Sequence, residues 1–506
     1  MAPFLYYSLL SLVLILSVKF LVESQSRKLK NLPPGPPRLP IIGNLHYMKP
    51  PVHLPFAKLS ETYGDMISLW FGSRLVVVLS SLSLARECFG TNDVILANRP
   101  RFLAGKYASY KWSTLATTSY GEHWRNVRRI ATVDVLSSHR LNSFTAARED
   151  EIRRMVWRLG QEAMSREGEG EGEGEGFVRV GLRERLMETT FNNMMRMISG
   201  KRFHGDGCTA KDVEEARVFR DDISNLLELA AAQNKADFFP FLRVFDFEGL
   251  LRRLKRIASS TDKFLQNLIE EHRSGKYANV ENMISHLLKL SESQPECYSD
   301  QTIKGLIQAM LIAGTDTSAL TVEWTMSELL NAPEVFQKAK DEIDTNIGKD
   351  RVVDEQDMAK LPYLQNIVNE TLRLHPAAPL SLPHESSEDC TIGGYHIPRG
   401  TIVLTNLWLI HRDPKLWSDP LSFKPERFEK GEENKLIAFG IGRRSCAGQG
   451  LAQRLVTYTV ALLIQCFQWK RESEEKIDMR EGKGLAVPKL IPLQAMCKSL
   501  PIVNKV

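Results

Sequence analysis

The sequence contains few cysteines, and their spacing is typical neither of a disulfide-bonded domain nor of a zinc site. Seven cysteines are scattered over 506 residues, and none belongs to a C-x-x-C pair. Even counts and short-range pairs are the usual marks of disulfide frameworks and zinc ligands. Neither is indicated here, so we expect the body of the protein to occupy a reducing compartment.

An excess of charge and a dinucleotide-binding fingerprint are also missing. The formal net charge is only +5 over 506 residues, which is too small to indicate a nucleic-acid partner. No convincing G-x-G-x-x-G run is present, so the chain should not carry flavin or nicotinamide domains of its own. With 43% hydrophobic and 25% charged residues, the composition is that of a packed globular body.

Only one long hydrophobic run is present, from Phe4 to Val22, and Lys19 alone interrupts it. As a helix this run would be about 28 Å long, enough to cross a bilayer. A cleaved signal peptide is the alternative, but no cationic segment precedes the run and no A-x-A-like site follows it. We therefore expect an uncleaved, single-pass anchor over residues 1–24. Basic residues at 27, 28 and 30 follow it, which favours a cytosolic location for the large C-terminal body.

A proline-rich segment, Leu32 to Pro40, follows the anchor. Prolines fix φ and favour an extended chain, so we interpret residues 25–44 as a basic, stiff hinge. An SH3-type ligand is the alternative, but it would have to be exposed and mobile. Residues 45–506 should then form one large domain.

The periodicity of that domain is mainly helical, with a smaller β part. The stretch from Asp65 to Ser80 carries β-branched and aromatic residues on both sides of Gly72-Ser73, which predicts a hairpin. A second β region is predicted from Cys390 to Thr405, turning at Gly393-Gly394. The five Glu-Gly repeats at 167–176 cannot bury apolar surface and repel one another, so we expect a solvated, mobile loop there.

The stretch from Ala438 to Ala452, AFGIGRRSCAGQGLA, places Cys446 among glycines directly before an apolar helical run, Leu451 to Phe467. A helix N-terminus has free N–H groups and a partial positive charge, which favour a thiolate. Glycines allow the chain to approach a flat, bulky ligand closely. A single cysteine ligand to haem iron needs this arrangement. The alternative is a glycine-rich turn with a free buried cysteine.

The spacing Phe439-x-x-Gly442-x-Arg444-x-Cys446-x-Gly448 resembles the haem-binding signature of the cytochromes P-450, although Ala447 replaces the usual proline. The resemblance implies the cytochrome P-450 fold and haem b, with Cys446 as the iron ligand. It also implies that Phe439, Gly442, Arg444 and Gly448 shape the haem site. The resemblance further covers Leu32 to Pro40, which is similar to the proline-rich hinge of membrane-bound members.

Further haem contacts are predicted on a helix that contains Trp124 and Arg128, one turn apart on one face. A basic surface helix is the alternative. By resemblance, Trp124 and Arg128 hydrogen-bond the haem propionates, a suitable task for an indole N–H and a guanidinium. His384 occupies a place where many relatives have a propionate-binding arginine, so its contact is expected on the same basis.

One long helix is predicted from Asp300 to Asn331, with Ser299 as its N-cap and Pro333 after its end. Its middle, Ala313 to Ser318, contains glycine and polar residues, either as a solvated patch whose hydroxyls bond to i−4 carbonyls or as a functional site. The segment is similar to the A-G-x-D-T motif of the family. That implies a groove at Gly314 for dioxygen, a hydrogen bond from Thr317 to dioxygen and a proton supply through Asp316, and therefore monooxygenation.

Glu370 and Arg373 share a helix face, but the same spacing recurs at Glu122/Arg125, Glu151/Arg154, Glu214/Arg217 and Glu270/Arg273. The pair is distinguished by the His375-Pro376 that follows and by Arg427 in a P-E-R-F string. These match the E-x-x-R and P-E-R-F elements of the family. The resemblance implies that Glu370, Arg373 and Arg427 form a buried network that supports folding and haem retention.

Substrate contacts are predicted from family positions in three segments, 103–117, 377–382 and 485–487, and on the long helix. The residues are Tyr110, Trp112, Ala313, Ala378, Leu380 and Ala486. Tyr110 and Trp112 could stack on an aromatic substrate. The aromatic stretch from Asp237 to Phe247 is either core or, as in similar enzymes, a lid on the lipid side.

The resemblance covers essentially the whole chain and is closest to plant microsomal members of the isoflavone 2'-hydroxylase branch, in strings such as TSYGEHWRNVRRI and PHESSEDC. It implies a monooxygenase of the endoplasmic reticulum membrane that hydroxylates an isoflavonoid or flavonoid at the 2' or 3' position. The alternatives are oxidation of a lignan, xanthone or indolic compound, a reductant-independent haem-thiolate isomerase, and a haem-binding partner protein without activity.

The expected partners are membrane lipid, NADPH–cytochrome reductase as electron donor and cytochrome b5 as an optional second donor. A basic patch of Arg125, Arg129, Lys435 and Arg443 on the cysteine side would dock an acidic donor.

Overall fold

The computed structural model describes residues 30–166, 176–231, 235–239, 242, 249–277 and 279–506. The predicted anchor, the first residues of the hinge, the Glu-Gly repeat except its last residue, and most of the aromatic stretch after Asp237 lie outside these ranges. Within them, no helix is both long enough and apolar enough to cross a membrane.

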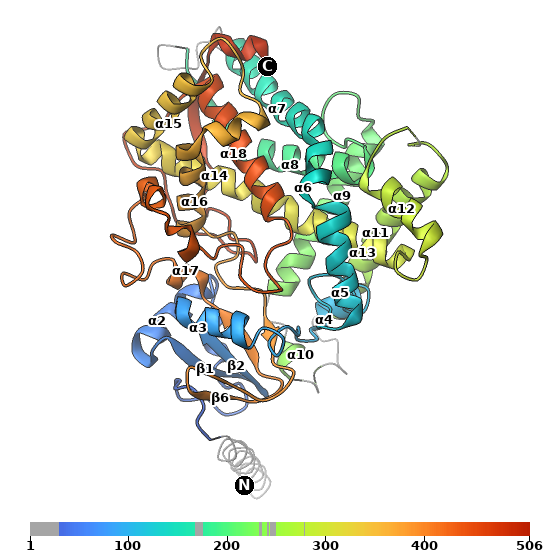
Figure 1. Cartoon of the computed structure of the whole chain (residues 1–506), viewed down its shortest axis with the longest axis vertical. Coiled ribbons are helices and arrows are strands. Elements are labelled where there is room, and N and C mark those ends of the chain that lie inside the picture. The colour runs from blue at the N-terminus through green and yellow to red at the C-terminus, as the bar shows by residue number, and fades with distance from the viewer. Residues whose placement is uncertain (1–29, 167–175, 232–234, 240–241, 243–248, 278) are drawn as a thin grey trace, which may run out of the picture.

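Helices make up most of the described chain, as predicted (Figure 1). Their bounds are α2 His53–Tyr63, α3 Leu82–Arg86, α4 Leu103–Ala108, α5 Glu122–Arg129, α6 Ser138–Ser143, α7 Thr145–Arg166, α8 Arg183–Ser199, α9 Ala210–Ala231, α10 Lys235–Phe238, α11 Leu250–Arg273, α12 Met283–Ser293, α13 Asp300–Gly314, α14 Asp316–Asn331, α15 Pro333–Asn346, α16 Pro362–Leu374, α17 Leu407–Ile410 and α18 Gln449–Cys466.

The strands form three small sheets. Their bounds are β1 Met66–Phe71, β2 Arg74–Leu79, β3 Val178–Gly181, β4 His384–Glu385, β5 Cys390–Ile392, β6 Tyr395–Ile397, β7 Ile402–Thr405, β8 Phe467–Lys470 and β9 Gln494–Ser499. The largest sheet has the order β1-β2-β7-β4, in which β2 and β7 are parallel and the other pairs antiparallel. The others are β3-β9-β8 and the hairpin β5-β6.

Both predicted turns are confirmed. Strands β1 and β2 pair with Phe71 opposite Arg74, and Gly72 between them has a φ of 55°. Gly393 and Gly394, between β5 and β6, have φ of 54° and 80°. Left-handed backbone is the conformation that glycine adopts at little cost, so the hairpins turn at these positions.

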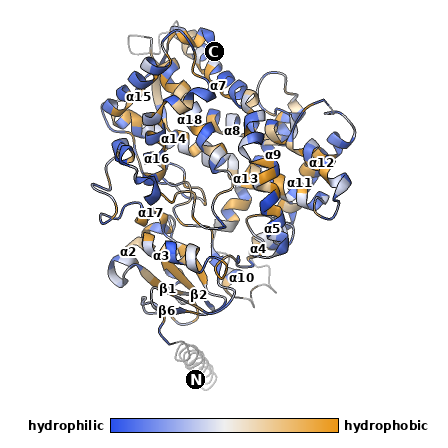
Figure 2. Cartoon of the chain, viewed as in Figure 1, coloured by the Kyte–Doolittle hydropathy of each residue, from blue (hydrophilic) through white to orange (hydrophobic). Residues whose placement is uncertain are grey.

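Helices α14, α16 and α18 form the centre of the helical part, since α14 packs against both others and against α8. Their apolar faces join those of α7 and α15 in one large hydrophobic cluster. Figure 2 shows hydrophilic residues along outer helices such as α7 and α15. The β1–β2 sheet lies at one end of the molecule and the C-terminus near the other (Figure 1).

The long helix predicted from Asp300 to Asn331 is divided into two. Ser299 caps it as expected, because its hydroxyl accepts from the amide of Thr302. The helix then breaks at Thr315, which has φ −81° and ψ −71°, and α14 begins at Asp316. The polar residues that made this segment unusual in sequence therefore coincide with a local interruption of the helix.

Candidate functional site

The loop that carries Cys446 lies immediately before α18, which begins at Gln449. The amide of Cys446 donates to the carbonyl of Phe439 over 2.8 Å. Gly442 has a φ of 74°, and a Cβ there would lie 2.6 Å from the carbonyl oxygen of Phe89. Both the backbone conformation and the close packing exclude a side chain at this position. The result is a tight loop that holds the cysteine at the start of the helix.

The Cys446 thiol combines solvent access with desolvating surroundings. The residue is exposed by surface area, yet burial among neighbouring atoms raises the pKa of the thiol, while the Gly448 amide and the Arg128 guanidinium act to lower it. The loss of hydration is the largest of these effects. A further cation close to the sulfur would favour the thiolate.

Trp124 and Arg128, on α5, lie beside this loop. The Nη1 of Arg128 donates to the carbonyl of Ser445 over 2.8 Å. Trp124 is buried, its Nε1–H has no hydrogen-bond partner within the described chain, and the Arg444 guanidinium lies 4.4 Å from its ring centroid. An unpaired buried donor is costly, so this corner is suited to an anionic acceptor.

Arg444 is held by the backbone around it. Its nitrogens donate to the carbonyls of Ala97, Leu115 and Thr118. Burial lowers the pKa of the guanidinium to about 9. The side chain therefore joins the cysteine loop to the segment before α5, and its charge remains next to Trp124.

His384 lies on β4 with its Nδ1 2.7 Å from the carbonyl oxygen of Leu96. Burial, followed by the charges of Arg99 and Arg444, lowers the pKa of this histidine well below 6.5. The ring is therefore neutral near pH 7, with Nδ1–H as the donor and Nε2 left as an acceptor. The hydrogen bond that we expected from His384 to a propionate would require protonation of Nε2.

Arg99 is a functional candidate that the sequence reasoning missed. It is 7% exposed, its Nη1 donates to the carbonyls of Leu382 and Pro383, and its Nε has no partner among the described residues. Burial lowers its pKa to about 10. The only signal in the sequence was an arginine directly before Pro100, in a segment flanked by apolar residues.

Two half-buried polar side chains, Asp316 and Thr317, follow the break between α13 and α14. The hydroxyl of Thr317 donates to the carbonyl of Ala313 over 2.5 Å, the i−4 bond that we had considered as the alternative. Ala313 is exposed although most of the helix is buried. Burial raises the pKa of the Asp316 carboxyl, and the charge of Arg220 acts against it. A carboxyl with a tendency to hold its proton thus adjoins an accessible hydroxyl.

Gly314, where we predicted a groove for dioxygen, packs against a neighbouring helix. A Cβ at this position would lie 2.8 Å from the Sδ of Met194, on α8. A side chain there would require the flexible methionine to move, and the groove stays a prediction. The accessible point of the segment is Ala313, one residue earlier.

Glu370, Arg373 and Arg427 come together in a buried network. The Nε and Nη2 of Arg373 donate to Glu370 over 2.7 and 2.8 Å, and the Nε of Arg427 donates to it over 3.0 Å. Glu370 and Arg373 are 0% exposed. The indole of Trp417 lies against both guanidiniums. Buried charges of this kind persist only when they are paired and hydrogen-bonded, as these are.

His411 connects this network to the cysteine loop. The Nη1 of Arg373 donates to the His411 carbonyl over 2.6 Å, and the Nε2 of the same histidine accepts from the amide of Ile437 over 3.1 Å. The carbonyl of Ile437 in turn accepts from the amide of Gly440, at the start of the loop. Burial, followed by the charges of Arg373 and Arg412, lowers the pKa of His411 to about 3, so the ring stays neutral and able to accept.

Comparison with known proteins agrees with this geometry. The profile of the cytochrome P-450 family matches residues 33–494. The chain belongs to the cytochrome P-450 family. An isoflavone 3'-hydroxylase from Medicago truncatula is 64% identical over 503 residues, 99% of each chain. An isoflavone 2'-hydroxylase from Glycyrrhiza echinata is 58% identical over 488 residues, 96% of each chain.

Solved structures of the family agree in fold. A zebra fish cytochrome P-450 in a structure with progesterone has a TM-score of 0.72 and 25% identity, covering 90% of this chain and 100% of that one. The chain is thus a haem-thiolate monooxygenase with the cytochrome P-450 fold. Its cofactor is haem b, and its electrons come from NADPH through a reductase.

The residues of this cytochrome P-450 fit haem. Cys446 would hold the iron, and the positive charge of the iron would favour the thiolate over the thiol. Trp124, with its unpaired Nε1–H, would donate to a propionate, and Arg128 and Arg99 would supply positive charge nearby. Phe439 and Gly448 lie on the loop next to the sulfur, where a Cβ on Gly448 would be 3.9 Å from it.

Two of the predicted substrate residues have their polar atoms engaged elsewhere. The hydroxyl of Tyr110 donates to Asp262 over 2.9 Å, and Lys304 donates to the same carboxylate over 2.6 Å. The Nε1 of Trp112 donates to the carbonyl of Phe102 over 2.7 Å. Each ring also has a cation over it, Lys304 at 5.6 Å from the Tyr110 centroid and Arg101 at 5.6 Å from the Trp112 centroid.

The segments that contain Ala378 and Ala486 are brought together. The amide of Val487 donates to the carbonyl of Ala377 over 3.0 Å. Leu380 lies in the first of these segments, where it pairs with Asn406 in an isolated bridge. Two of the three predicted substrate segments are thus neighbours in the fold, although about 100 residues separate them in the chain.

The predicted basic patch is largely neutralised by internal partners. Arg443 pairs with Asp93 over 2.8 Å and Lys435 with Glu432 over 2.8 Å. Arg129 donates to the hydroxyl of Tyr298 over 3.0 Å and lies 3.4 Å from Asp134. Arg125 lies over the ring of Tyr120, as Arg443 does.

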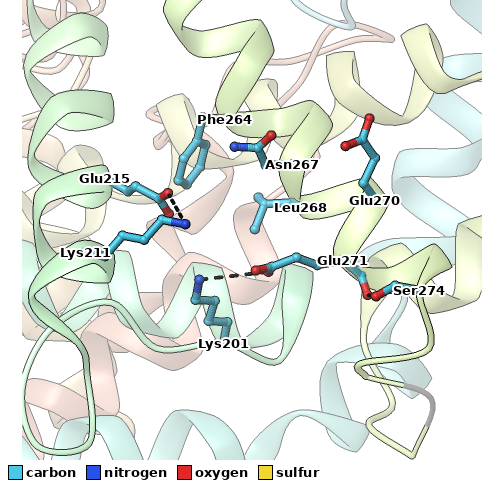
Figure 3. A pocket seen from close by; sticks show the side chains of 9 residues that line it. All are labelled: Lys201, Lys211, Glu215, Phe264, Asn267, Leu268, Glu270, Glu271 and Ser274. Atoms are coloured by element: carbon cyan, nitrogen blue, oxygen red, sulfur yellow. Dashed lines mark hydrogen bonds and ion pairs between the residues drawn. The ribbon is translucent and has the colours of Figure 1, made fainter.

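A surface pocket of about 390 Å³ lies between α9, α11 and Lys201, and none of its residues belongs to the predicted site (Figure 3). Lys201 pairs with Asp212 over 2.7 Å and lies 3.9 Å from Glu271, while Lys211 lies 3.7 Å from Glu215. Its cations are thus already matched by carboxylates, so we assign no ligand to it.

Proposed function

We propose that this cytochrome P-450 hydroxylates an isoflavonoid at the 2' or 3' position. The observation that carries the proposal is the 64% identity, over 99% of both chains, with an isoflavone 3'-hydroxylase. The 58% identity with an isoflavone 2'-hydroxylase supports the substrate class and leaves two positions of attack.

Haem held by a cysteine thiolate supplies the reductive activation of dioxygen. Asp316 would relay protons from solvent, and burial raises the pKa of its carboxyl. Thr317 would pass these protons on from its hydroxyl, which now donates to the carbonyl of Ala313 and still has lone pairs to accept with. The exposed Ala313 leaves space beside this hydroxyl for a substrate.

We also propose that residues 1–24 anchor the chain in the endoplasmic reticulum membrane and that residues 25–44 act as a hinge. The catalytic domain, residues 45–506, would lie in the cytosol, where a reductase and cytochrome b5 can reach its cysteine side. The apolar run, which only Lys19 interrupts, and the basic residues that follow it support this topology.

The test is a reconstituted assay with the purified protein, a reductase and NADPH. A panel of isoflavones, flavonoids, lignans, xanthones and indoles would be supplied, and products would be identified by mass and by position. We expect 2'- or 3'-hydroxyisoflavone, formed only when NADPH and reductase are both present.

Other outcomes would contradict the proposal. Turnover of a lignan, xanthone or indole with no reaction on isoflavones would redirect the substrate class. Conversion of a hydroperoxide without reductant would indicate an isomerase, which the two hydroxylase relatives do not favour.

A further inference from the structure

Trp324, on α14, contacts the loop before β9 that brings Ala486 to the predicted substrate pocket. The indole is 2% exposed, and its Nε1–H donates to the carbonyl of Val487 over 3.2 Å. The amide of the same Val487 donates to the carbonyl of Ala377. A single peptide segment is therefore fixed on one side by the helix and on the other by the second pocket segment.

The indole ring is held in turn by two neighbouring side chains. The His375 ring stacks on it with centroids 4.1 Å apart and planes 2° from parallel. The ammonium of Lys489 lies 4.9 Å from the ring centroid, in a side chain that is 1% exposed. A desolvated cation over an indole face is a strong form of the cation–π interaction. His375 directly follows α16, the helix that carries Glu370, and Lys489 belongs to the loop before β9. The indole ring on α14 therefore connects three parts of the chain.

Glu323, the residue next to Trp324, holds the same loop further along. Its carboxylate accepts from the amide of Leu493 over 2.8 Å and from Arg183 over 2.9 Å. Arg183 also donates to the carbonyl of Lys489 over 3.0 Å. The loop is thus fixed to α14 at both ends of the stretch from Val487 to Leu493.

Trp324 lies seven residues after Thr317, which is two helical turns along nearly the same face and about 10 Å along the axis. One rigid helix therefore carries both the proposed proton donor and the anchor of the substrate loop. We infer that Trp324 is a positioning residue that sets where the Leu485–Val487 segment lies relative to Thr317, and so selects which ring carbon of the substrate is oxidised. This inference rests on the proposed function for its substrate.

The test compares Trp324→Phe with Trp469→Phe. Trp324→Phe keeps an aromatic ring against His375 and removes the pyrrole part of the indole together with the donor to Val487. Trp469→Phe removes a similar indole bond, 2.8 Å to the carbonyl of Leu463, away from the pocket segments. Both holoenzymes would be selected for an intact thiolate band in the carbon monoxide complex. The ratio of 2' to 3' products and the hydrogen exchange of the Val487 amide would then be measured.

For Trp324→Phe we expect the product ratio to change several-fold and the Val487 amide to exchange about tenfold faster. The loss of one hydrogen bond raises the equilibrium constant for local opening by about tenfold. Trp469→Phe should leave both unchanged. Lys489→Met, which removes the ammonium from the same ring, should shift both in the same direction, and it serves if Trp324→Phe does not retain haem.

An unchanged ratio and unchanged exchange in Trp324→Phe would overturn the inference, and so would equal changes in Trp469→Phe. If the wild type forms no isoflavone product, the proposed function fails. The exchange of the Val487 amide then decides alone whether Trp324 fixes the loop: faster exchange keeps the positioning role, and unchanged exchange ends it.

Discussion

Replacing Glu370 by glutamine would remove the negative charge at the centre of the buried network. The carboxylate accepts twice from Arg373, once from Arg427 and once from the amide of Lys424. An amide has one oxygen to accept with, and its NH₂ would face a donor. Glu370→Gln therefore loses hydrogen bonds and leaves two buried guanidiniums without a counter-charge.

Breaking a buried ion pair by removing one partner costs about 3–5 kcal/mol. That is a factor of roughly 100 to 4,000 in the equilibrium between native and unfolded protein. Because Arg373 holds His411 and His411 holds the cysteine loop, we expect the loss to appear first as loss of thiolate-bound haem.

The assay is a urea titration that follows haem retention and the thiolate band of the carbon monoxide complex. Glu214→Gln is the matched control, since Glu214 and Arg217 have the same spacing and are each 59% exposed. An exposed ion pair stabilises the native state by at most about 0.5 kcal/mol. The urea midpoint of Glu214→Gln should therefore stay near that of the wild type. Equal midpoints for Glu370→Gln and Glu214→Gln would refute the reasoning.

Three further predictions concern the haem and oxygen residues. Thr317→Ala and Asp316→Asn should each lower the amount of product formed per NADPH oxidised by about 10²-fold, as expected for loss of a proton donor, while NADPH oxidation continues. A product-to-NADPH ratio equal to that of the wild type in both variants would contradict the relay. Trp124→Phe should weaken haem retention by about 1–3 kcal/mol, measured by haem transfer to apomyoglobin, whereas Trp469→Phe should not. Because the buried His411 ring has a pKa of about 3 against 6.5, the protein should lose stability as the pH falls from 6.5 towards 3. In acid titrations of the thiolate band, His411→Gln should reduce that slope by the share of His411, while buried histidines such as His384 keep theirs.

The sequence pattern predicted what depends on local rules. The hairpins followed from Gly72-Ser73 and Gly393-Gly394 between β-rich runs, and the cap at Ser299 from its place before an amphipathic segment. The motif residues Glu370, Arg373 and Arg427 were named from spacing and resemblance, and the structure places them in contact.

Properties that depend on packing could not be predicted in this way. A sequence does not show which neighbour packs against a glycine, and at Gly314 that neighbour is Met194. It also does not show how strongly the folded chain desolvates the Cys446 thiol, and this burial raises the pKa of the thiol. His411 and Trp324 were missed because they act through long-range contacts, such as the bond of His411 to Ile437 and that of Trp324 to Val487, and such contacts have no sequence period.

The contacts of the buried network also explain why charged residues occupy these positions, although apolar residues would avoid the free-energy cost of desolvating a charge. The chain from His411 to Ser422 is mostly irregular, so its carbonyls lack the partners that a helix or sheet would supply. Arg373 and Arg427 donate to five of them, at positions 411, 418, 419, 420 and 422. Apolar substitutes could fill the volume but would leave these carbonyls unsatisfied. Two guanidiniums are needed as donors, and Glu370 is then needed to balance their charge.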